Sequence, residues 1–187
     1  MFIQTEETPN PQTLKFIPES TVMESGTAFF TDPKDATVSP LATELFSIDG
    51  VEAVFLGNDF ITITKSENED WESLKAPLLT CIMDFFVAKK PVMLSTEKNN
   101  ISDSASNSED DEISQQIREL IDTRVRPAVA QDGGDIIFRG FSDGIVSLEM
   151  HGSCSGCPSS TITLKNGVEN MLKHYIPEVI AVEAVSA

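Results

Sequence analysis

Apolar residues late in the chain recur at the spacing of an α-helix. They stand at positions 113, 117, 120, 121, 125, 128 and 129. A repeat of three or four residues places them on one face, so this segment is predicted to be an amphipathic helix. The Asp-Gly-Gly run at 132–134 is expected to end that helix, because glycine readily leaves the helical conformation.

Two strand patterns, a helix and a further strand follow this first helix. Residues 135–141 and 145–150 are predicted strands, joined by Asp143-Gly144, which is a strong signal for a tight hairpin turn. A helix from residue 158 to residue 175 and a strand over residues 179–185 complete the chain. The order α-β-β-α-β predicts a small two-layer α+β domain over residues 113–187.

The first half of the chain shows a second mixture of strand and helix patterns. Strands are predicted over residues 14–17 and 27–31, and residues 51–56 and 60–64 form a predicted hairpin. Ser39-Pro40 predicts a helix start, with serine as the cap and proline at the first helical position. A longer helix carries a core-facing apolar stripe from Trp71 to Phe86, and Pro77 inside it predicts a kink or a late start. Residues 1–94 therefore form a second small α+β domain.

Two polar segments interrupt these patterns. The Thr-Pro-Asn-Pro run at 8–11 is rigid and favours a plain turn, with a recognition loop as the alternative. Residues 95–112 hold one large apolar residue, Ile101, among serine, asparagine and acidic residues. Such a segment cannot bury enough surface to offset its chain entropy, so it is predicted to be a flexible acidic linker. The alternative is a long surface loop within one domain.

Charge narrows the classes of partner. The chain has 187 residues and a formal net charge of −17, from 30 acidic and 13 basic residues. Phosphate backbones and anionic lipid should repel it, so neither a nucleic acid nor a membrane surface is an expected partner. The polar start after Met1 and the absence of a long apolar run favour the cytoplasm, or the mitochondrial matrix if a transit peptide has been removed. The three cysteines fit a reducing compartment, where a close pair more often serves metal or redox chemistry.

The candidate chemistry lies in one segment, His-Gly-Ser-Cys-Ser-Gly-Cys-Pro at 151–158. Cys154 and Cys157 can direct both sulfurs at one point, and the two glycines let the loop approach that point without side-chain clash. Pro158 fits the first position of the following helix. The positive end of that helix favours thiolate over thiol at Cys157 and, less strongly, at Cys154. Thiolate is both the metal ligand and the nucleophile.

The number of ligands is the next constraint. A tetrahedral zinc ion or an iron–sulfur cluster usually takes four protein ligands, and the motif supplies two. Cys81 is predicted to be a small buried hydrophobe in the other domain, and His151 a polar surface residue at a strand end. Two chains related by a two-fold axis reach four ligands if each presents Cys154 and Cys157 to one shared cluster. A cluster with only two anchors per chain should be easily released, which suits a carrier.

Two other functions use the same motif. A thioredoxin-like dithiol oxidoreductase also needs Cys-x-x-Cys at a helix N-terminus, but no βαβ unit is predicted ahead of the motif here. A structural zinc site formed by the same dimer would be colourless and would stabilise the fold outright. Visible colour and iron content distinguish a cluster from both alternatives.

The sequence also resembles a known family across nearly the whole chain outside the linker. Residues 113–187, with Gln-Asp-Gly-Gly-Asp at 131–135 and Gly-Ser-Cys-Ser-Gly-Cys-Pro-Ser-Ser at 152–160, resemble the NifU-type C-terminal domain. Residues 1–94 look like the N-terminal domain of Nfu iron–sulfur carriers, through the runs at 4–11, 14–16, 46–50 and 84–86.

This resemblance implies a carrier and not an enzyme. Cys154 and Cys157 are then expected to bind an iron–sulfur cluster, usually a [4Fe–4S] cluster that bridges a homodimer, with [2Fe–2S] as the other form. The family delivers such clusters from an upstream donor to apo-proteins, and its N-terminal domain is associated with contacts to partners or targets. The cysteine motif matches the family pattern without departure.

Overall fold

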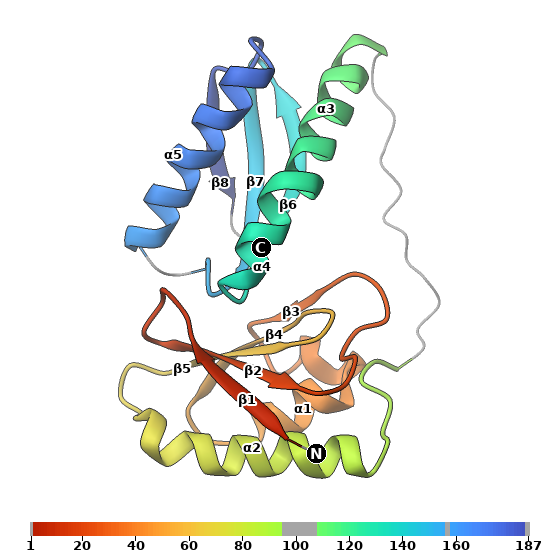
Figure 1. Ribbon diagram of the computed structural model, residues 1–187, viewed down its shortest axis with the longest axis vertical. Coiled ribbons are helices and arrows are strands. Elements are labelled where there is room, and N and C mark those ends of the chain that lie inside the picture. Colours follow the sequence, from red (N-terminus) through yellow and green to blue (C-terminus); the bar gives the residue numbers. More distant parts are fainter. Residues whose placement is uncertain (1, 95–107, 156–157, 186–187) are drawn as a thin grey trace. The chain divides into compact units, whose positions relative to one another are not determined.

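The computed structural model describes residues 2–94, 108–155 and 158–185. The chain divides into two compact units, residues 1–100 and 101–187, and each combines a sheet with helices (Figure 1). The predicted α+β class with two small domains is therefore confirmed. Residues 95–107 of the predicted linker lie outside the described residues, so the proposed domain boundaries stay a prediction.

The first unit is built on a five-stranded antiparallel sheet in the order β1-β2-β5-β4-β3. The predicted strands, hairpin and Ser39-Pro40 helix start are all present, and the Ser39 hydroxyl accepts a hydrogen bond from the Ala42 nitrogen at 3.2 Å. The elements are β1 (Ile3–Glu7), β2 (Thr13–Pro18), β3 (Ala28–Phe30), α1 (Pro40–Phe46), β4 (Val51–Leu56), β5 (Ile61–Lys65) and α2 (Trp71–Val87), with a short 3₁₀ turn at Asp35–Val38.

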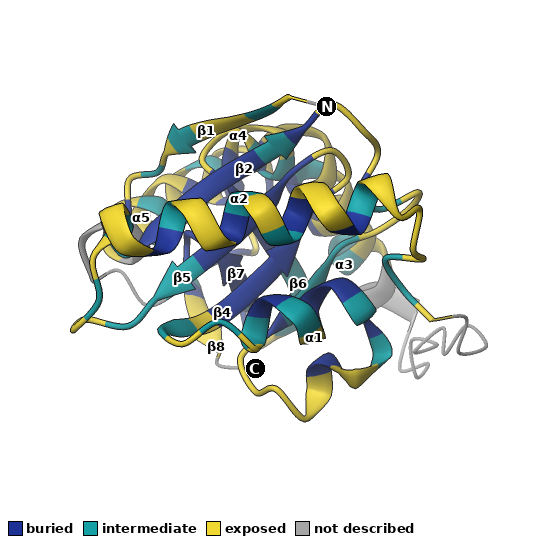
Figure 2. Ribbon diagram, turned by 90° about the horizontal axis from the view of Figure 1, so that it is seen from below, coloured by how far each residue is buried: buried dark blue, intermediate teal, exposed yellow. Residues whose placement is uncertain are grey.

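Helices α1 and α2 lie across one face of this sheet and turn their buried residues toward the strands (Figure 2). The apolar stripe of α2 is core, as predicted, because Leu74, Leu78, Ile82 and Phe85 are buried. Pro77 produces no late start, since α2 begins at Trp71 and Pro77 lies on its exposed side. Cys81 packs against this core but is only partly buried, so the prediction of a small buried hydrophobe holds in part.

One strand of the first unit has no apolar signal. The polar residues 4–7 belong to β1, which lies at the sheet edge and pairs only with β2. Charged side chains suit an edge strand because they oppose pairing with other chains. The Thr-Pro-Asn-Pro run forms the turn from β1 to β2, in which the Thr8 hydroxyl donates to the carbonyls of Asn10 and Thr13 at 2.9 Å. The turn interpretation is confirmed.

The second unit has the predicted order α-β-β-α-β. Its elements are α3 (Ser108–Leu120), a π-helical turn (Ile121–Val125), α4 (Arg126–Gln131), β6 (Gly134–Ser142), β7 (Ile145–Gly152), α5 (Pro158–Tyr175) and β8 (Ala181–Val185). β6 and β7 form an antiparallel hairpin, whereas β8 pairs parallel to β7 after the α5 crossover. Residues of α5 and of the helix formed by α3, the π turn and α4 share one core cluster with the sheet. No helix among the described residues is long and apolar enough to cross a membrane.

The long helix of the second unit differs from the prediction in its start and in its buried face. It begins at Ser108, earlier than the predicted Ile113, so residues 108–112 of the predicted linker are helical. Its buried residues are Ile117, Ile121, Val125 and Val129, four apart, and Ala128 is exposed, contrary to the predicted face. Residues four apart drift slowly off one face of a regular α-helix, because each turn holds fewer than four residues. A π-helical turn holds more residues, and the one over Ile121–Val125, just before Pro127, keeps the buried residues on one face.

Candidate metal centre

Cys154 lies in the loop that leaves the end of β7 and enters α5. β7 ends at Gly152 and α5 begins at Pro158, which confirms the predicted strand–loop–helix junction. Cys154 is buried and belongs to the core cluster of the second unit. Gly156 and Cys157 lie outside the described residues, so the pairing of Cys157 with Cys154 and its expected place beside the helix start stay predictions.

The cysteine loop rests on the turn that joins α4 to β6. We call residues 132–134 the glycine platform. The Ser153 nitrogen donates to the Gly133 carbonyl at 3.2 Å, and the Ser153 hydroxyl donates to the Asp132 carbonyl at 2.5 Å. Gly133 and Gly152 have φ angles of 78° and 65°, which other residues rarely adopt. Two backbone turns distant in sequence are thus held together directly beneath Cys154.

Gly134 is the residue that the Cys154 thiol lies against. A Cβ atom added at Gly134 would be 2.6 Å from the Cys154 Sγ and 2.9 Å from the His151 carbonyl oxygen. Only a residue without a side chain leaves room for this sulfur. Gly133 ends α4, as predicted for the glycine pair, but the second glycine has a separate role that its place beside a helix end does not reveal.

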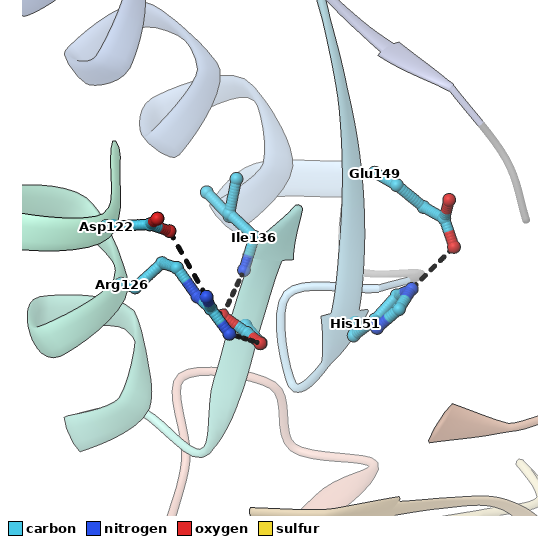
Figure 3. A network of polar contacts seen from close by, with 6 residues as sticks. Asp122, Arg126, Ile136, Glu149 and His151 are labelled. Atoms are coloured by element: carbon cyan, nitrogen blue, oxygen red, sulfur yellow. Dashed lines mark hydrogen bonds and ion pairs between the residues drawn. The ribbon is translucent and has the colours of Figure 1, made fainter. Parts of the chain in front are cut away.

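An ion pair fixes the two ends of the segment that holds the platform. The Arg126 guanidinium donates from Nε to Asp135 Oδ1 at 2.8 Å and from Nη2 to Oδ2 at 2.7 Å (Figure 3). The Ile136 nitrogen also donates to Asp135 Oδ1, at 2.8 Å, and Arg126 Nη1 reaches the exposed Asp122 at 3.2 Å. The hydrogen bond to Asp135 raises the pKa of Arg126 well above its ordinary value against the opposing effect of burial. The guanidinium therefore stays charged.

A second charged group lies on β7 just before the cysteine loop. His151 Nε2 is 2.5 Å from Glu149 Oε1 (Figure 3). Arg139 Nε donates to the other carboxylate oxygen of Glu149. Burial opposes ionisation of Glu149, but the hydrogen bonds from Arg139 and His151 outweigh it and lower the pKa of this carboxyl. His151 is buried, so its expected surface position was wrong. Sequence spacing alone gave no sign of this cluster beyond the alternate positions of Glu149 and His151.

The remaining cysteine is not prepared for metal binding. Cys81 lies on α2 in the other unit, where burial and then the charge of Glu44 raise the pKa of its thiol. A raised pKa keeps the group protonated at neutral pH, whereas a ligand must be thiolate. Within the described ranges, no group of three or more His, Cys, Asp or Glu side chains could hold a metal ion. The candidate ligands remain Cys154 and Cys157, and soft thiolates suit zinc or an iron–sulfur cluster.

Each of the two α+β units matches a family model of NifU-type proteins. Residues 3–89 match the family described as scaffold protein Nfu/NifU N terminal, and residues 117–183 match the NifU-like domain. The chain belongs to the Nfu family of iron–sulfur cluster scaffold proteins, which confirms the resemblance found in the sequence.

Full-length similarity to curated proteins supports the same assignment. The chain is 55% identical over 186 residues to the human protein named NFU1 iron-sulfur cluster scaffold homolog, mitochondrial, and covers 72% of its length. It is 50% identical to NifU-like protein 4, mitochondrial, of Arabidopsis thaliana and 52% identical to the NFU1 homolog of Drosophila virilis, covering 65% and 62% of those proteins. In each case 98% or 99% of this chain is aligned. The human and Drosophila relatives are named as iron–sulfur cluster scaffold homologs.

Replacing Gly134 by alanine should displace the Cys154 thiol. The new methyl group would overlap both Sγ and the His151 backbone oxygen, and the latter cannot rotate away. We expect Gly134→Ala to lose about 2 kcal/mol of stability and most of the iron retained on purification. Iron analysis and urea denaturation followed by circular dichroism measure the two effects.

Gly140→Ala is the matched control, because it lies in the same strand and an added Cβ meets nothing within 4 Å. Equal iron content and equal stability in the two variants would contradict the role assigned to Gly134.

Glu149→Gln should destabilise the second unit in a pH-dependent way. The folded pKa of Glu149 lies below its ordinary value of 4.5, so its ionised form stabilises the fold above that pH. This contribution is lost as the pH falls through the lowered pKa. We expect a deficit of about 1 kcal/mol at pH 7 that shrinks toward zero in acid.

Urea denaturation at several pH values tests this expectation. Circular dichroism reports both units, and the fluorescence of Trp71, the one tryptophan of the sequence, reports the first unit alone. Glu183→Gln, at an exposed position of β8, is the control and should leave the stability at pH 7 unchanged. A deficit for Glu149→Gln that is the same in acid and at neutral pH would contradict the assignment.

Proposed function

We propose that this protein carries an iron–sulfur cluster on Cys154 and Cys157 and delivers it to apo-proteins. The cluster is [4Fe–4S], shared between two copies of the chain, with [2Fe–2S] as the smaller alternative. The observation that carries the proposal is the Cys154 loop on its glycine platform, because the Cys154 thiol is packed against the Gly134 backbone in the loop that leads into a helix. Membership in the scaffold family supports the choice of cargo.

The ligand count supports sharing between chains. One chain offers two suitable thiolates, Cys154 and Cys157, while Cys81 stands in the other unit with a raised pKa. A cluster prefers four ligands, so a homodimer with one cluster at its seam completes the set. The helix that follows each cysteine pair would present its positive end toward a cluster that carries net negative charge.

Delivery requires only the exchange of ligands. A cysteine thiol of the apo-protein loses its proton and bonds to iron, while the thiolate of Cys154 or Cys157 leaves and takes up a proton. Four such exchanges move the cluster with no change in its oxidation state and no bond-making catalysis by this chain. Two anchors per chain make each exchange easier than release from four cysteines of one chain.

The relatives bear on the compartment. Those named above are described as mitochondrial, which favours the matrix over the cytoplasm among the two compartments left open by the sequence. Iron–sulfur target proteins and an upstream donor in that compartment are the proposed partners.

Cys154→Ser and Cys157→Ser should each abolish stable cluster binding, because either change leaves one thiolate per chain. Protein purified without air is expected to be brown, with iron and inorganic sulfide in equal amounts, and both variants to be colourless. Visible absorption and chemical analysis measure the loss.

Cys81→Ser serves as the control and should keep full iron and sulfide. A Cys154→Ser variant that still holds a complete cluster would refute the ligand assignment. Insulin reduction by colourless wild-type protein would favour a dithiol oxidoreductase, and stoichiometric zinc in place of iron would favour a structural zinc site.

A further inference from the structure

We infer that Arg126 and Asp135 are positioning residues for Cys154, and that their ion pair governs how firmly the cysteine loop is held. The pair clamps the glycine platform, and the platform in turn carries the loop. The consequence for cluster retention rests on the proposed function, whereas the effect on the Cys154 thiol does not.

The ion pair closes the segment that contains the platform. Arg126 is the first residue of α4, and Asp135 is the second residue of β6. A guanidinium that donates to both carboxylate oxygens fixes orientation as well as distance. The Ile136 nitrogen holds the same carboxylate from the strand side at 2.8 Å. Arg126 and Asp135, which flank residues 127–134, are therefore held together through the buried Asp135 carboxylate.

The clamped segment needs this restraint because two glycines lie in it. Glycine has the largest backbone freedom of any residue, so Gly133 and Gly134 could otherwise shift together with the carbonyl groups that they position. Those carbonyl groups accept both hydrogen bonds from Ser153, the residue next to Cys154. Gly134 itself lies against the Cys154 Sγ. Movement of the platform would thus reach the thiol through three contacts at once.

The effect on a bound cluster follows from the direction of this support. The Cys154 sulfur is packed against the Gly134 backbone and cannot move further in that direction, so it stays directed toward the iron of a bound cluster. If the platform loosens, the thiol gains room on that side and leaves iron more readily. Partners that orient a metal ligand without touching the metal commonly change retention by about tenfold.

The test measures the Cys154 thiol in protein without a cluster. In the full chain carrying Cys157→Ser, the rate at which iodoacetamide alkylates Cys154 is followed by peptide mass spectrometry, with Cys81 as the internal reference. Asp135→Asn removes the carboxylate charge, and Arg126→Lys keeps the positive charge but loses the fork. We expect both to raise the rate at Cys154 several-fold and to leave the rate at Cys81 unchanged.

The matched control is Asp122→Asn. It removes only the exposed partner of Arg126, at 3.2 Å, and leaves the bond to Asp135 in place, so alkylation should stay at the wild-type rate. Ser153→Ala cuts the same support from the loop side without touching the ion pair, and should also speed alkylation. This variant keeps the inference testable if Asp135→Asn fails to fold.

A second readout uses cluster-loaded protein that retains Cys157. Loss of visible absorbance to an iron chelator should be about tenfold faster in Arg126→Lys and Asp135→Asn than in Asp122→Asn. An unchanged Cys154 alkylation rate would overturn the inference. So would an increase no larger than the change in the global unfolding equilibrium measured in urea, because the pair would then be merely structural. If wild-type protein holds no cluster, the proposed function fails while the alkylation result still decides the positioning role.

Discussion

The close approach of the Cys154 sulfur to the Gly134 backbone is the contact on which the candidate site depends. It brings a thiol from the β7–α5 loop against the turn between α4 and β6, and it is possible only because residue 134 has no side chain. Hydrogen bonds from Ser153 hold the two turns in register, and the paired Arg126 and Asp135 close the segment beneath them. The glycine run at 133–134 and Cys154 are therefore parts of one arrangement, although they lie about 20 residues apart in the chain.

A second constraint is the small number of thiolates per chain. The structure places Cys154 in the β7–α5 loop and Cys81 in the other unit, where the raised pKa of Cys81 disfavours its thiolate, and Cys157 is the proposed second ligand. A firmly held cofactor normally has its full set of ligands in one chain, whereas a cargo benefits from an incomplete set that a neighbour completes. Membership in a scaffold family agrees with this second case. Among its described residues the first unit has no group of three or more His, Cys, Asp or Glu side chains that could hold a metal ion.

The amino-acid sequence predicts the backbone best where a local signal determines it. Ser39-Pro40 starts α1, Asp143-Gly144 turns the β6–β7 hairpin, and Pro158 opens α5, because capping and turn chemistry act within a few residues. Features that depend on tertiary structure were not predicted. The edge strand β1 is polar, Ala128 is turned out of the core by the π-helical turn, and Gly134 owes its role to a sulfur contributed by residue 154. The ion pair between Arg126 and Asp135 joins two different elements, so the apolar periodicity within either element does not predict it.

The number of irons per chain is the most direct test of whether two chains share one cluster. Native mass spectrometry of protein purified without air gives the number of chains, irons and sulfides in each particle at once. Sharing of one [4Fe–4S] cluster predicts a particle of two chains, with about two irons per chain, that separates into single chains when the cluster is removed. A single chain that retains all four irons, with no small thiol bound to supply the missing ligands, would contradict it.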